Sequence, residues 1–598
     1  MAEAAPAFLG VTRSLTGRRW RARAQNERLV QALAQRLGVP ELVARVLAGR
    51  GVGLEQGDNF LNPTLRDLLP DPSRFHDMDR AAARVARAIQ SGEAIAVFGD
   101  YDVDGATSAA LLKLFCRAVG ADIRVYVPDR IREGYGPNAP ALLKLAAEGA
   151  RLVITVDCGT LAYGALAAAA AAGLEVIVVD HHLAEPALPA ALAVINPNRL
   201  DESGHHRQLA AVGVAYLLVV AVNRALRAAG WYAARPEPNL LQWLDLVALG
   251  TVCDVVPLTG VNRALVGQGL KLLAQRGNIG LAALADVAGL HEPPGCFHLG
   301  FLLGPRVNAG GRVGQADLGA QLLTTTDPAE AATLARELDR LNAERRAIES
   351  MVQEDATARA LADGEAAAAA TPLIVAAGRG WHQGVIGIVA ARLKERFRRP
   401  ALVVALDGGI GKGSARSVPG VDLGSAVTAA RQAGLLINGG GHAMAAGLTV
   451  AEERLAELVD FLRARLAPQV AKLAAVASLG LDGALAVGGA TADLLDLLDR
   501  AGPYGPGHAE PRFAVAGARV VQPVVVGAKH VRCTLLGPDG SRLKAVAFRA
   551  LENGIGEALL RSDGLALHVA GALRADHWRG ERRVQLVIED AARAAGAG

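Results

Sequence analysis

Three short apolar runs in the first half of the chain each end in a side chain that can bind a metal ion. The runs IAVFGD, LVITVD and VIVVD reach Asp100, Asp157 and Asp180, respectively. Continuous apolar runs that alternate with helical stretches are typical of buried parallel strands. In a doubly wound sheet the carboxyl ends of such strands line the ligand crevice. The three runs therefore predict an α/β fold with a parallel sheet and one shared site at its edge.

The first run continues as GDYDVDG, which places carboxylates at alternate positions, Asp100, Asp102 and Asp104. In an extended backbone these side chains would project together off the end of a strand. Like charges this close repel, so the cluster needs protons or cations, and hard divalent ions are natural partners for oxygen ligands. An EF-hand Ca²⁺ loop is excluded, because its twelfth residue would be Glu and position 111 is Leu.

Other candidate ligands stand in similar places. His181 and His182 directly follow Asp180, and Asp254 follows the apolar segment LVALGTVC. Taken singly, each acidic residue is more often a cap or turn residue, but the context that the set shares favours a metal site. An oxygen-rich set with imidazole fits Mn²⁺ or Mg²⁺, and the absence of cysteine among the candidates disfavours zinc.

In chain order, GDYDVDG, VDCGT, VDHH and GTVCDVVPL match the four motifs of the DHH phosphoesterase superfamily. Together with motifs further along, the chain resembles the RecJ family of single-strand-specific exonucleases, from about Phe60 to the last residue. The resemblance implies hydrolysis of single-stranded DNA from 5′ to 3′ to mononucleotides, with two Mn²⁺ or Mg²⁺ ions, in DNA repair and recombination. It implies these metal ligands: Asp100, Asp102, Asp104, Asp157, His181 and Asp254.

The resemblance also gives roles to the remaining residues of the third motif. His182 is expected to contact the scissile phosphate or to assist proton transfer. Asp180 is expected to orient the two histidines.

The expected domain order combines the resemblance with local composition. Leucines and other apolar residues recur at helical spacing after residue 334, which predicts a long amphipathic connector helix. Short alternating runs with Gly-rich turns near the end predict a small β-barrel. The expected domains are an N-terminal basic arm with helices (1–75), a DHH catalytic domain (76–313), the connector helix (314–369), a second α/β domain of DHHA1 type that binds substrate (370–474) and an OB-fold-like domain (475–598).

The stretch VPDRIREGYGPN, residues 127–138, is too polar and Gly-rich for a core, and an exposed loop is the simplest interpretation. An arginine beside a flat aromatic ring also suits single-strand binding. The resemblance assigns the 5′ phosphate to Arg130 and stacking near the strand end to Tyr135.

Two further Gly-rich motifs carry candidate substrate residues. GPRVNAGGRVGQA, residues 304–316, is expected to be a loop, either a plain turn or one that approaches phosphates. GKGSARS and GGGHAMAAG resemble the phosphate-holding and backbone-cradling motifs of the second domain. The substrate residues implied here are Arg306, Asn308, Arg312, Ser414, Arg416 and His442.

The C-terminal segment offers several basic residues for a nucleic-acid face, although a solvated surface explains each of them equally well. They are Lys529, His530, Arg532, Lys544 and Arg549.

Composition narrows the remaining possibilities. A content of 51% hydrophobic and 20% charged residues over 598 residues is globular, and a net charge of +4 means that an anionic partner must be held by local basic patches. Five scattered cysteines without a C-x-x-C pair fit a reducing cytoplasm. Leu209 to Val222 is shorter than the roughly 20 residues of a membrane span, so we expect a buried helix there.

The N-terminus carries arginines at 13, 18, 19, 21 and 23, and no apolar stretch follows that would indicate a signal peptide. A solvated tail is favoured over a nucleic-acid-binding arm. We expect a cytoplasmic monomer that does not bind membranes, with single-stranded DNA bearing a 5′ end as its substrate. By resemblance, a single-strand-binding protein and a RecQ-type helicase are possible partners.

Two rival functions use the same motifs. A small-substrate DHH phosphoesterase would lack the C-terminal barrel, and the segment from about 475 onward argues against it. A non-catalytic DNA-binding scaffold would have lost ligands, whereas all four motifs are filled here.

Overall fold

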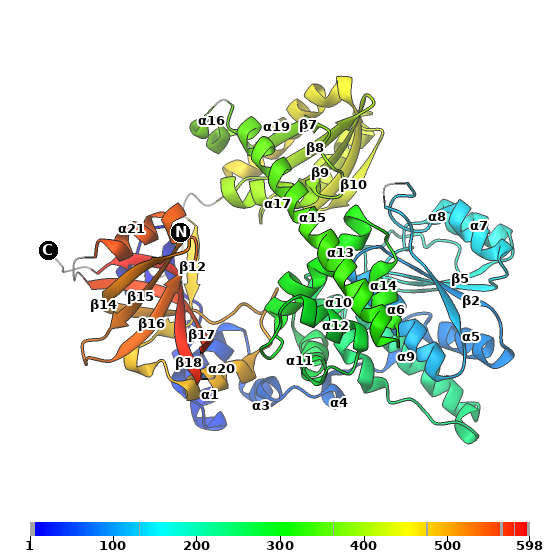
Figure 1. Ribbon diagram of the computed structural model, residues 1–598, viewed down its shortest axis with the longest axis horizontal. Helices are drawn as coiled ribbons and strands as arrows, with labels where there is room; N and C mark the ends of the chain where they lie inside the picture. The colour runs from blue at the N-terminus through cyan, green and yellow to red at the C-terminus, as the bar shows by residue number, and fades with distance from the viewer. Residues whose placement is uncertain are drawn as a thin grey trace. The chain divides into compact units, whose positions relative to one another are not determined.

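The computed structural model describes residues 6–130, 132–362, 364–473, 477–562, 566–578 and 581–594 (Figure 1). The chain forms two compact units, which we name for their place in the sequence. The central unit comprises residues 70–254 and 268–473, and the terminal unit comprises residues 1–69, 255–267 and 474–598. The domain boundary expected at 474 falls on residues outside the described part of the chain.

A five-stranded parallel sheet carries the first three motifs, as the apolar runs predicted. Its strand order is β3-β2-β4-β5-β6, and every pair is parallel. The strands are β2 (Ile95–Gly99), β3 (Ile123–Tyr126), β4 (Leu152–Val156), β5 (Glu175–Val179) and β6 (Ala193–Ile195). The α/β fold class is therefore confirmed.

Helices cover both faces of this sheet. On one face, Leu142, Leu145 and Leu166 from two helices pack onto Val153 and Val176 of the strands. On the other face, long apolar helices contact the strands and one another. The helices of the sheet are α5 (Met78–Ser91), α6 (Val103–Ala118), α7 (Ala139–Ala147), α8 (Tyr163–Ala171) and α9 (Ala211–Ala228).

Helix α9 is the expected buried helix. By length and composition it is the one helix in the described residues that could cross a membrane, but 72% of its apolar window is buried inside the protein. It therefore serves as a core helix of the central unit.

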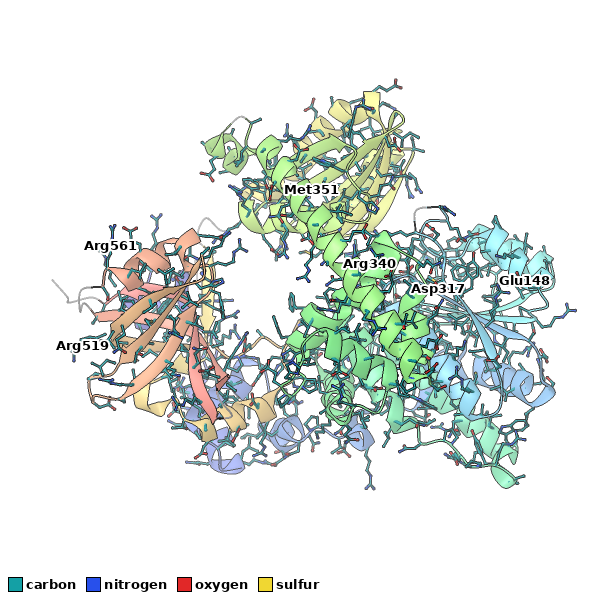
Figure 2. The ribbon with its side chains drawn as sticks, in the orientation of Figure 1. Glu148, Asp317, Arg340, Met351, Arg519 and Arg561 are labelled. Carbon is teal, nitrogen blue, oxygen red and sulfur yellow. The ribbon has the colours of Figure 1, made fainter. Side chains whose placement is uncertain are left out.

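A helical layer follows the sheet and leads to a 33-residue helix, α15 (Pro328–Ala360), which is the predicted long amphipathic helix. Arg340 and Met351 mark this helix in Figure 2. The other helices between the sheet and α15 are α10 (Leu244–Cys253), α12 (Ile279–Val287), the π-helix η6 (His298–Leu303), α13 (Gly304–Val313) and α14 (Leu318–Thr324). Helix α11 (Gly260–Gln275) begins in the terminal unit and ends in the central unit, and α16 (Glu365–Ala370) follows α15.

A second sheet of five strands, mostly antiparallel, completes the central unit. Its order is β10-β11-β9-β8-β7, in which only β7 and β8 are parallel. Its elements are β7 (Ile374–Arg379), α17 (Ile386–Phe397), β8 (Ala401–Asp407), β9 (Ile410–Arg416), α18 (Leu423–Gln432), β10 (Asn438–His442), β11 (Ala445–Ala451) and α19 (Leu455–Ala471).

The terminal unit contains the predicted barrel. Strands β14, β15, β16, β18 and β17 pair in that order, and β17 pairs again with β14, so the ring is closed. The elements of this part of the unit are β12 (Ser478–Leu481), β13 (Gly483–Ala484), α20 (Ala492–Ala501), β14 (Phe513–Val526), β15 (His530–Leu536), β16 (Arg542–Ala547), α21 (Gly554–Leu560), β17 (Ala566–Trp578) and β18 (Glu581–Arg593).

The interpretation of the N-terminus as a solvated tail is wrong. Strand β1 (Arg19–Ala22) pairs in parallel with β12, and Trp20 is fully buried. The indole Nε1 of Trp20 donates to Asp590 at 2.9 Å, and Arg18 lies 3.4 Å from the same carboxylate. Two arginines of the supposed tail thus have buried partners, because Arg23 also pairs with Asp482.

The first helices after β1 pack into the core of the barrel. Val30 and Leu33 share one apolar cluster with barrel residues such as Phe513 and Leu586. These N-terminal helices are α1 (Glu27–Leu37), α2 (Glu41–Gly49), α3 (Gly57–Leu61) and α4 (Leu65–Leu68).

Candidate active site

The ends of the three motif strands meet at one edge of the sheet, and the turn after β4 is sharp. Asp157 has φ 61° and Gly159 has φ 116°, and both values lie in the left-handed region. A non-glycine residue in this region is uncommon and is typical of functional sites. The turn places Asp157, which is buried, beside the histidines that follow β5.

The carboxylates of GDYDVDG converge, but not through the extended backbone that the alternation predicted. Asp100 follows β2, Asp102 is the N-cap of α6, and Asp104 already lies in the first helical turn. The Asp102 carboxylate accepts from the amides of Asp104 and Gly105. Gly105 has no room for a side chain, because an added Cβ would lie 2.4 Å from the Asp100 carbonyl oxygen.

The candidate ligands form one cluster. His181 Nε2 lies 3.3 Å from Asp157 Oδ1, 3.5 Å from Asp254 Oδ2 and 3.9 Å from Asp104 Oδ2. Three overlapping groups have ligand atoms within 4.8 Å of one another. They are Asp100, Asp102 and Asp157; Asp104, His181 and Asp254; and Asp157, His181 and His182.

Unpartnered polar atoms show that this cluster fits divalent cations. Among the described residues, Asp100 Oδ1, Asp157 Oδ1, His181 Nε2 and Asp254 Oδ2 are buried without a hydrogen-bond partner. Buried polar atoms are normally hydrogen-bonded, so such a convergence needs an explanation. Oxygen atoms and one imidazole nitrogen are the donor set that Mn²⁺ or Mg²⁺ would take.

The protein alone does not stabilise so many negative charges. Burial and the charge of Asp102 raise the pKa of Asp100 and of Asp157, and they raise the pKa of Asp104 to about 7. Burial and the charge of Asp104 raise the pKa of Asp254 to about 9. Carboxylates that share a site ionise together only when cations compensate them.

Asp180 organises the two histidines. Its carboxylate accepts from the backbone amides of His181 and His182, from the amide of Thr160 and, at 2.8 Å, from His182 Nδ1. Burial tends to lower the pKa of His182, but the hydrogen bond with Asp180 and the charges of the nearby carboxylates together outweigh it and raise this pKa to about 9. Burial and the neighbouring charge of His182 instead lower the pKa of His181 to about 4. The neutral His181 can act as a ligand and the charged His182 as a donor.

Two asparagines that the sequence analysis missed hold the same segment. Asn196 Nδ2 donates to the carbonyl of His182 at 2.8 Å, and Asn198 Nδ2 donates to the carbonyl of His181 at 2.6 Å. They follow β6 in INPN, so they stand in the same strand-end context that identified the other candidates.

Arg130 and Tyr135 lie beside the cluster, together with a further residue that the analysis missed. The Arg130 guanidinium lies 4.9 Å from the ring centre of Tyr101, and the rings of Tyr101 and Tyr135 meet edge to face at 6.5 Å. The Tyr135 hydroxyl donates to the carbonyl of Asp157 at 3.0 Å and lies 3.3 Å from His182 Nδ1. Tyr101 could have been noticed as the aromatic residue inside GDYDVDG.

The predicted loop at 304–316 is wrong, because most of it forms α13. Arg306 is buried and paired with Asp339 at 2.9 Å, and it also donates to the carbonyl of Leu302. These contacts give it a structural role and do not bring it to the cluster. Asn308 lies half-buried in the same helix.

Arg312 is different, because it lies near other cations. Burial and the charge of Arg130 lower its pKa to about 10, and its guanidinium donates to the carbonyl of Gly384 at 2.9 Å. Burial and the charge of Arg130 also lower the pKa of Arg416. Guanidinium groups that lie close together despite their mutual repulsion are typical of an anion-binding site.

The second sheet supplies the remaining candidates. Arg416 donates to Ser414 Oγ at 3.1 Å, and both lie on β9 beside the first turn of α17, where a Cβ added to Gly387 would lie 3.0 Å from each side chain. His442, at the end of β10, is exposed. Burial of its ring and the charges of His182 and Arg416 lower its pKa.

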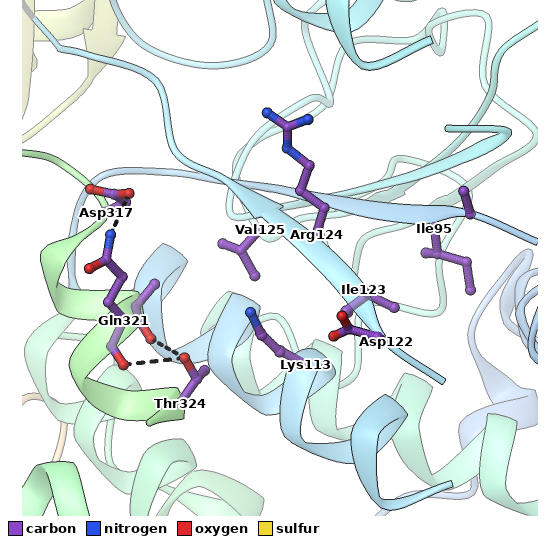
Figure 3. A pocket seen from close by; sticks show the side chains of 11 residues that line it. Ile95, Lys113, Asp122, Ile123, Arg124, Val125, Asp317, Gln321 and Thr324 are labelled. Carbon is purple, nitrogen blue, oxygen red and sulfur yellow. Dashed lines mark hydrogen bonds between the residues drawn. The ribbon is translucent and has the colours of Figure 1, made fainter. Parts of the chain in front are cut away.

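A cavity lies away from the acidic cluster. A space of about 530 Å³ opens at the amino ends of β2 and β3, beside Lys113 of α6 and Gln321 of α14 (Figure 3). It therefore lies at the opposite end of the strands from the acidic cluster. Its lining mixes both charges, and Asp317 already accepts from Gln321 at 2.7 Å. The candidate active site is therefore identified by the chemistry of the donor atoms in the acidic cluster and not by the size of a cavity.

Comparisons with known proteins agree with this geometry. Residues 94–251 match the family described as "DHH family, N-terminal domain", residues 370–467 match the "DHHA1 domain", and residues 481–590 match the "RecJ OB domain". The chain is 39% identical to the single-stranded-DNA-specific exonuclease RecJ of Dickeya dadantii over 92% of this chain and 96% of that protein. It is 36% identical to RecJ of Escherichia coli over the same shares.

Solved structures give a similar result. The crystal structure of RecJ from Thermus thermophilus in complex with Mn²⁺ superposes with a TM-score of 0.77 at 30% identity, over 95% of this chain and 78% of that one. A structure of exonuclease RecJ bound to manganese superposes with a TM-score of 0.57 at 34% identity, over 67% of this chain and 97% of that one.

Proposed function

This chain belongs to the RecJ family of single-stranded-DNA-specific exonucleases, and from that premise we propose that it removes mononucleotides from single-stranded DNA in the 5′ to 3′ direction. It is a metal-dependent hydrolase that uses Mn²⁺ or Mg²⁺. The observation that carries the proposal is the cluster of buried carboxylates with unpartnered oxygen atoms beside His181.

The residues that would hold the ions are those of the cluster, Asp100, Asp102, Asp104, Asp157, His181 and Asp254; Asp157 belongs to two of the three ligand groups. When bound, such a pair of cations would activate water and stabilise the charge that develops on the phosphate. Asp180 keeps His182 protonated at Nδ1. The charged ring can then donate a hydrogen bond to the scissile phosphate.

End recognition is assigned to the arginines and to Tyr135. Arg130, Arg312, Ser414 and Arg416 supply donors without a carboxylate partner in the described part of the chain, which suits a terminal phosphate. Tyr135 is exposed and can stack on a terminal base. His442 and Asn308 are two further proposed substrate contacts. Metals alone would allow cutting anywhere along a strand, so these contacts provide the preference for an end.

The closed barrel of the terminal unit and the complete ligand set favour this function over the small-substrate and scaffold alternatives. We further propose a role in DNA repair and recombination for a cytoplasmic monomer. A single-strand-binding protein and a RecQ-type helicase are its proposed partners.

The test uses one oligonucleotide labelled at its 5′ or 3′ end, digested with Mn²⁺ and then with Mg²⁺. We expect the 5′ label to appear first as a mononucleotide. The Asp157→Asn variant should lose activity by more than about 100-fold, since even groups that only support metal ligands are worth roughly 10- to 100-fold. Asparagine is the appropriate substitution, because it tolerates the left-handed backbone at this position.

The matched control is Asp317→Asn, which removes a carboxylate from the remote cavity and should leave turnover unchanged. Single-strand binding measured in Ca²⁺ should persist in Asp157→Asn. Prior release of the 3′ label would contradict the polarity, and near-normal turnover of Asp157→Asn would contradict the ligand assignment.

A further inference from the structure

The segment that carries Arg130 and Tyr135 contains a carboxylate to which the proposed function gives no role. Glu133 Oε2 accepts from the Tyr126 hydroxyl at 2.8 Å and from Asn138 Nδ2 at 3.3 Å. Its other oxygen, Oε1, accepts from the backbone amide of Asp129 at 2.9 Å. One side chain therefore contacts three separate points of the segment.

These three points are the two ends of the segment and its turn. Tyr126 is the last residue of β3, and Asn138 is the N-cap of α7, where its Oδ1 accepts from the Ala141 amide. Asp129 begins the turn, and its carbonyl accepts from the Glu133 amide at 2.8 Å. The Glu133 carboxylate thus ties the end of a strand, the turn and the start of a helix together.

Both proposed substrate residues lie inside the part that is tied. Arg130 belongs to the turn between Asp129 and Glu133, and from there it reaches the Tyr101 ring. Tyr135 follows Glu133 by two residues, between Gly134 with φ 84° and Gly136 with φ 78°. Backbone with glycines in this region has many alternative conformations, so a fixed position of Tyr135 needs an external restraint.

A carboxylate without partners on the segment that carries Arg130 and Tyr135 would repel an anionic substrate. Three donors engage Glu133 instead, and none of them is a proposed metal ligand. We propose that Glu133 is a positioning residue that fixes the described residues of this segment, 127–130 and 132–138, so that Arg130 and Tyr135 are preorganised to receive the 5′ end. This inference rests on the proposed function and deepens it.

Glu133→Ala removes all three contacts and should raise KM for a 5′-phosphorylated single strand by about tenfold, because binding must then order the segment. The value of kcat at saturating substrate should change by less than about threefold, since the metal cluster is untouched. The preference for a 5′ phosphate over a 5′ hydroxyl should fall toward that of Arg416→Ala, which serves as the reference for a lost phosphate contact.

Glu133→Gln is the conservative variant. Its carbonyl oxygen can still accept from the Asp129 amide, but its NH₂ group would face the donors of Tyr126 and Asn138. Its KM should therefore fall between those of wild type and Glu133→Ala. The matched control is Glu148→Ala, in which the lost carboxylate follows α7 and pairs with Arg124 at the surface (Figure 2). That control should keep wild-type KM and end preference.

A second readout does not depend on catalysis. Limited trypsin digestion of the full chain, followed by mass spectrometry, should show faster cleavage after Arg130 and Arg132 in Glu133→Ala than in wild type or Glu148→Ala. Equal cleavage rates, or an unchanged KM and end preference, would overturn the inference. A wild-type enzyme without any preference for a 5′ phosphate would instead contradict the proposed end recognition on which the inference rests.

Discussion

At the scale of single residues, Asp245 is an unusual carboxylate outside the acidic cluster. It lies in the first turn of α10 and is 3% exposed, and the structure pairs no cation with it in the described residues. Its carboxylate accepts a hydrogen bond from the Leu246 amide at 2.8 Å. Burial raises the pKa of Asp245 from 3.8 to about 6.

This shift predicts a pH-dependent stability. The pKa of Asp245 is higher in the folded state than in the unfolded state. The contribution of Asp245 to the free energy of unfolding is therefore greatest below pH 4 and is lost as the pH rises through 6. Asp245→Asn should therefore raise the free energy of unfolding at pH 8 by about 2–3 kcal/mol. Thermal unfolding of wild type and of Asp245→Asn at pH 4.5 and 8 measures this change in stability.

The expected increase in Tm is a few degrees at pH 8 and much smaller at pH 4.5. Asp317→Asn is the control for the substitution itself, because its carboxylate is half-buried and accepts from Gln321. If Asp245→Asn changes the free energy of unfolding equally at both pH values, burial of the ionised Asp245 carboxylate does not destabilise the folded protein.

Residue types and spacing pointed to most of the acidic cluster, because its ligands lie at or just after the ends of apolar runs. They did not separate Arg306 from Arg312, which share one motif. Only the fold shows that Arg306 pairs with Asp339 whereas Arg312 lies near Arg130. The hydrogen bond from Asn196 could not be predicted either, because its partner His182 follows a different strand and the two meet only in the folded protein.

At the scale of elements, α13 shows why a Gly-rich motif was misread as a loop. Its glycines serve close packing, and they lie where neighbouring backbone leaves no space. A Cβ on Gly310 would lie 2.7 Å from the carbonyl oxygen of Gln315, and a Cβ on Gly311 would lie 2.6 Å from that of Tyr101. Sequence alone does not distinguish a glycine needed for packing from a glycine needed for a turn.

Gly311→Ala is therefore expected to displace the segment that carries Asp100 and Asp102. The backbone at Tyr101 must move, because two atoms cannot remain 2.6 Å apart at this contact. Turnover should fall by about tenfold or more with single-strand binding largely retained, since misplacement of about 1 Å costs up to 100-fold. Steady-state kinetics together with circular dichroism measures the effect.

Gly164→Ala is the matched control, because it also lies in a helix and its Cβ would meet nothing within 4 Å. It should leave activity unchanged and should stabilise α8 slightly, since alanine favours helices by up to about 1 kcal/mol over glycine. If both variants keep wild-type turnover, the contact between α13 and Tyr101 does not position the cluster.

The strands of the parallel sheet and the long helix α15 were predictable, because each has a strong local pattern. The arrangement of the acidic residues was not, because three carboxylates at alternate positions suggested an extended chain. The Asp102 side chain instead caps a helix that begins immediately after it. Capping competes with strand geometry wherever aspartate precedes a helix-forming segment.

At the scale of the whole molecule, the barrel of the terminal unit presents a basic face that shares only Arg532 with the expected set. Lys529 and Arg549 both pair with Glu552, so their charges are largely compensated. Arg519, Arg532 and Arg542 are exposed and have no acidic partner among the described residues; Figure 2 labels Arg519.

The cross-strand register places these three arginines on one outward face. Arg519 and Arg542 both lie opposite Leu536, and Arg532 alternates with residues that point into the barrel. Such a face is suited to hold the phosphates of a long single strand.

Replacing Arg519, Arg532 and Arg542 together with alanine should weaken binding of long single strands and flatten its salt dependence. Each lost phosphate contact lowers the log–log slope by about 0.7, so the total change is about 2. Hydrolysis of short oligonucleotides should remain near the wild-type rate, because the central unit contains the candidate active site. Binding titrations over a series of salt concentrations measure the slope.

The double variant Lys529→Ala with Arg549→Ala is the control. It should change the log–log slope by less than about 0.7, which is the value for one phosphate contact. If the control flattens the slope and the triple variant does not, the phosphates follow the face expected from sequence and not the one described here.

The pairing of β1 with β12 also bears on how this protein is made. Trp20 and its partner Asp590 are 570 residues apart. A ribosome adding about 5–20 residues per second needs roughly half a minute to two minutes to cover that distance. During this interval the first helices emerge without the surface that buries them, while the parallel sheet can already fold. We therefore expect the N-terminal segment to stay unburied until synthesis is nearly finished, and truncated products should be recognised and degraded through that exposed end.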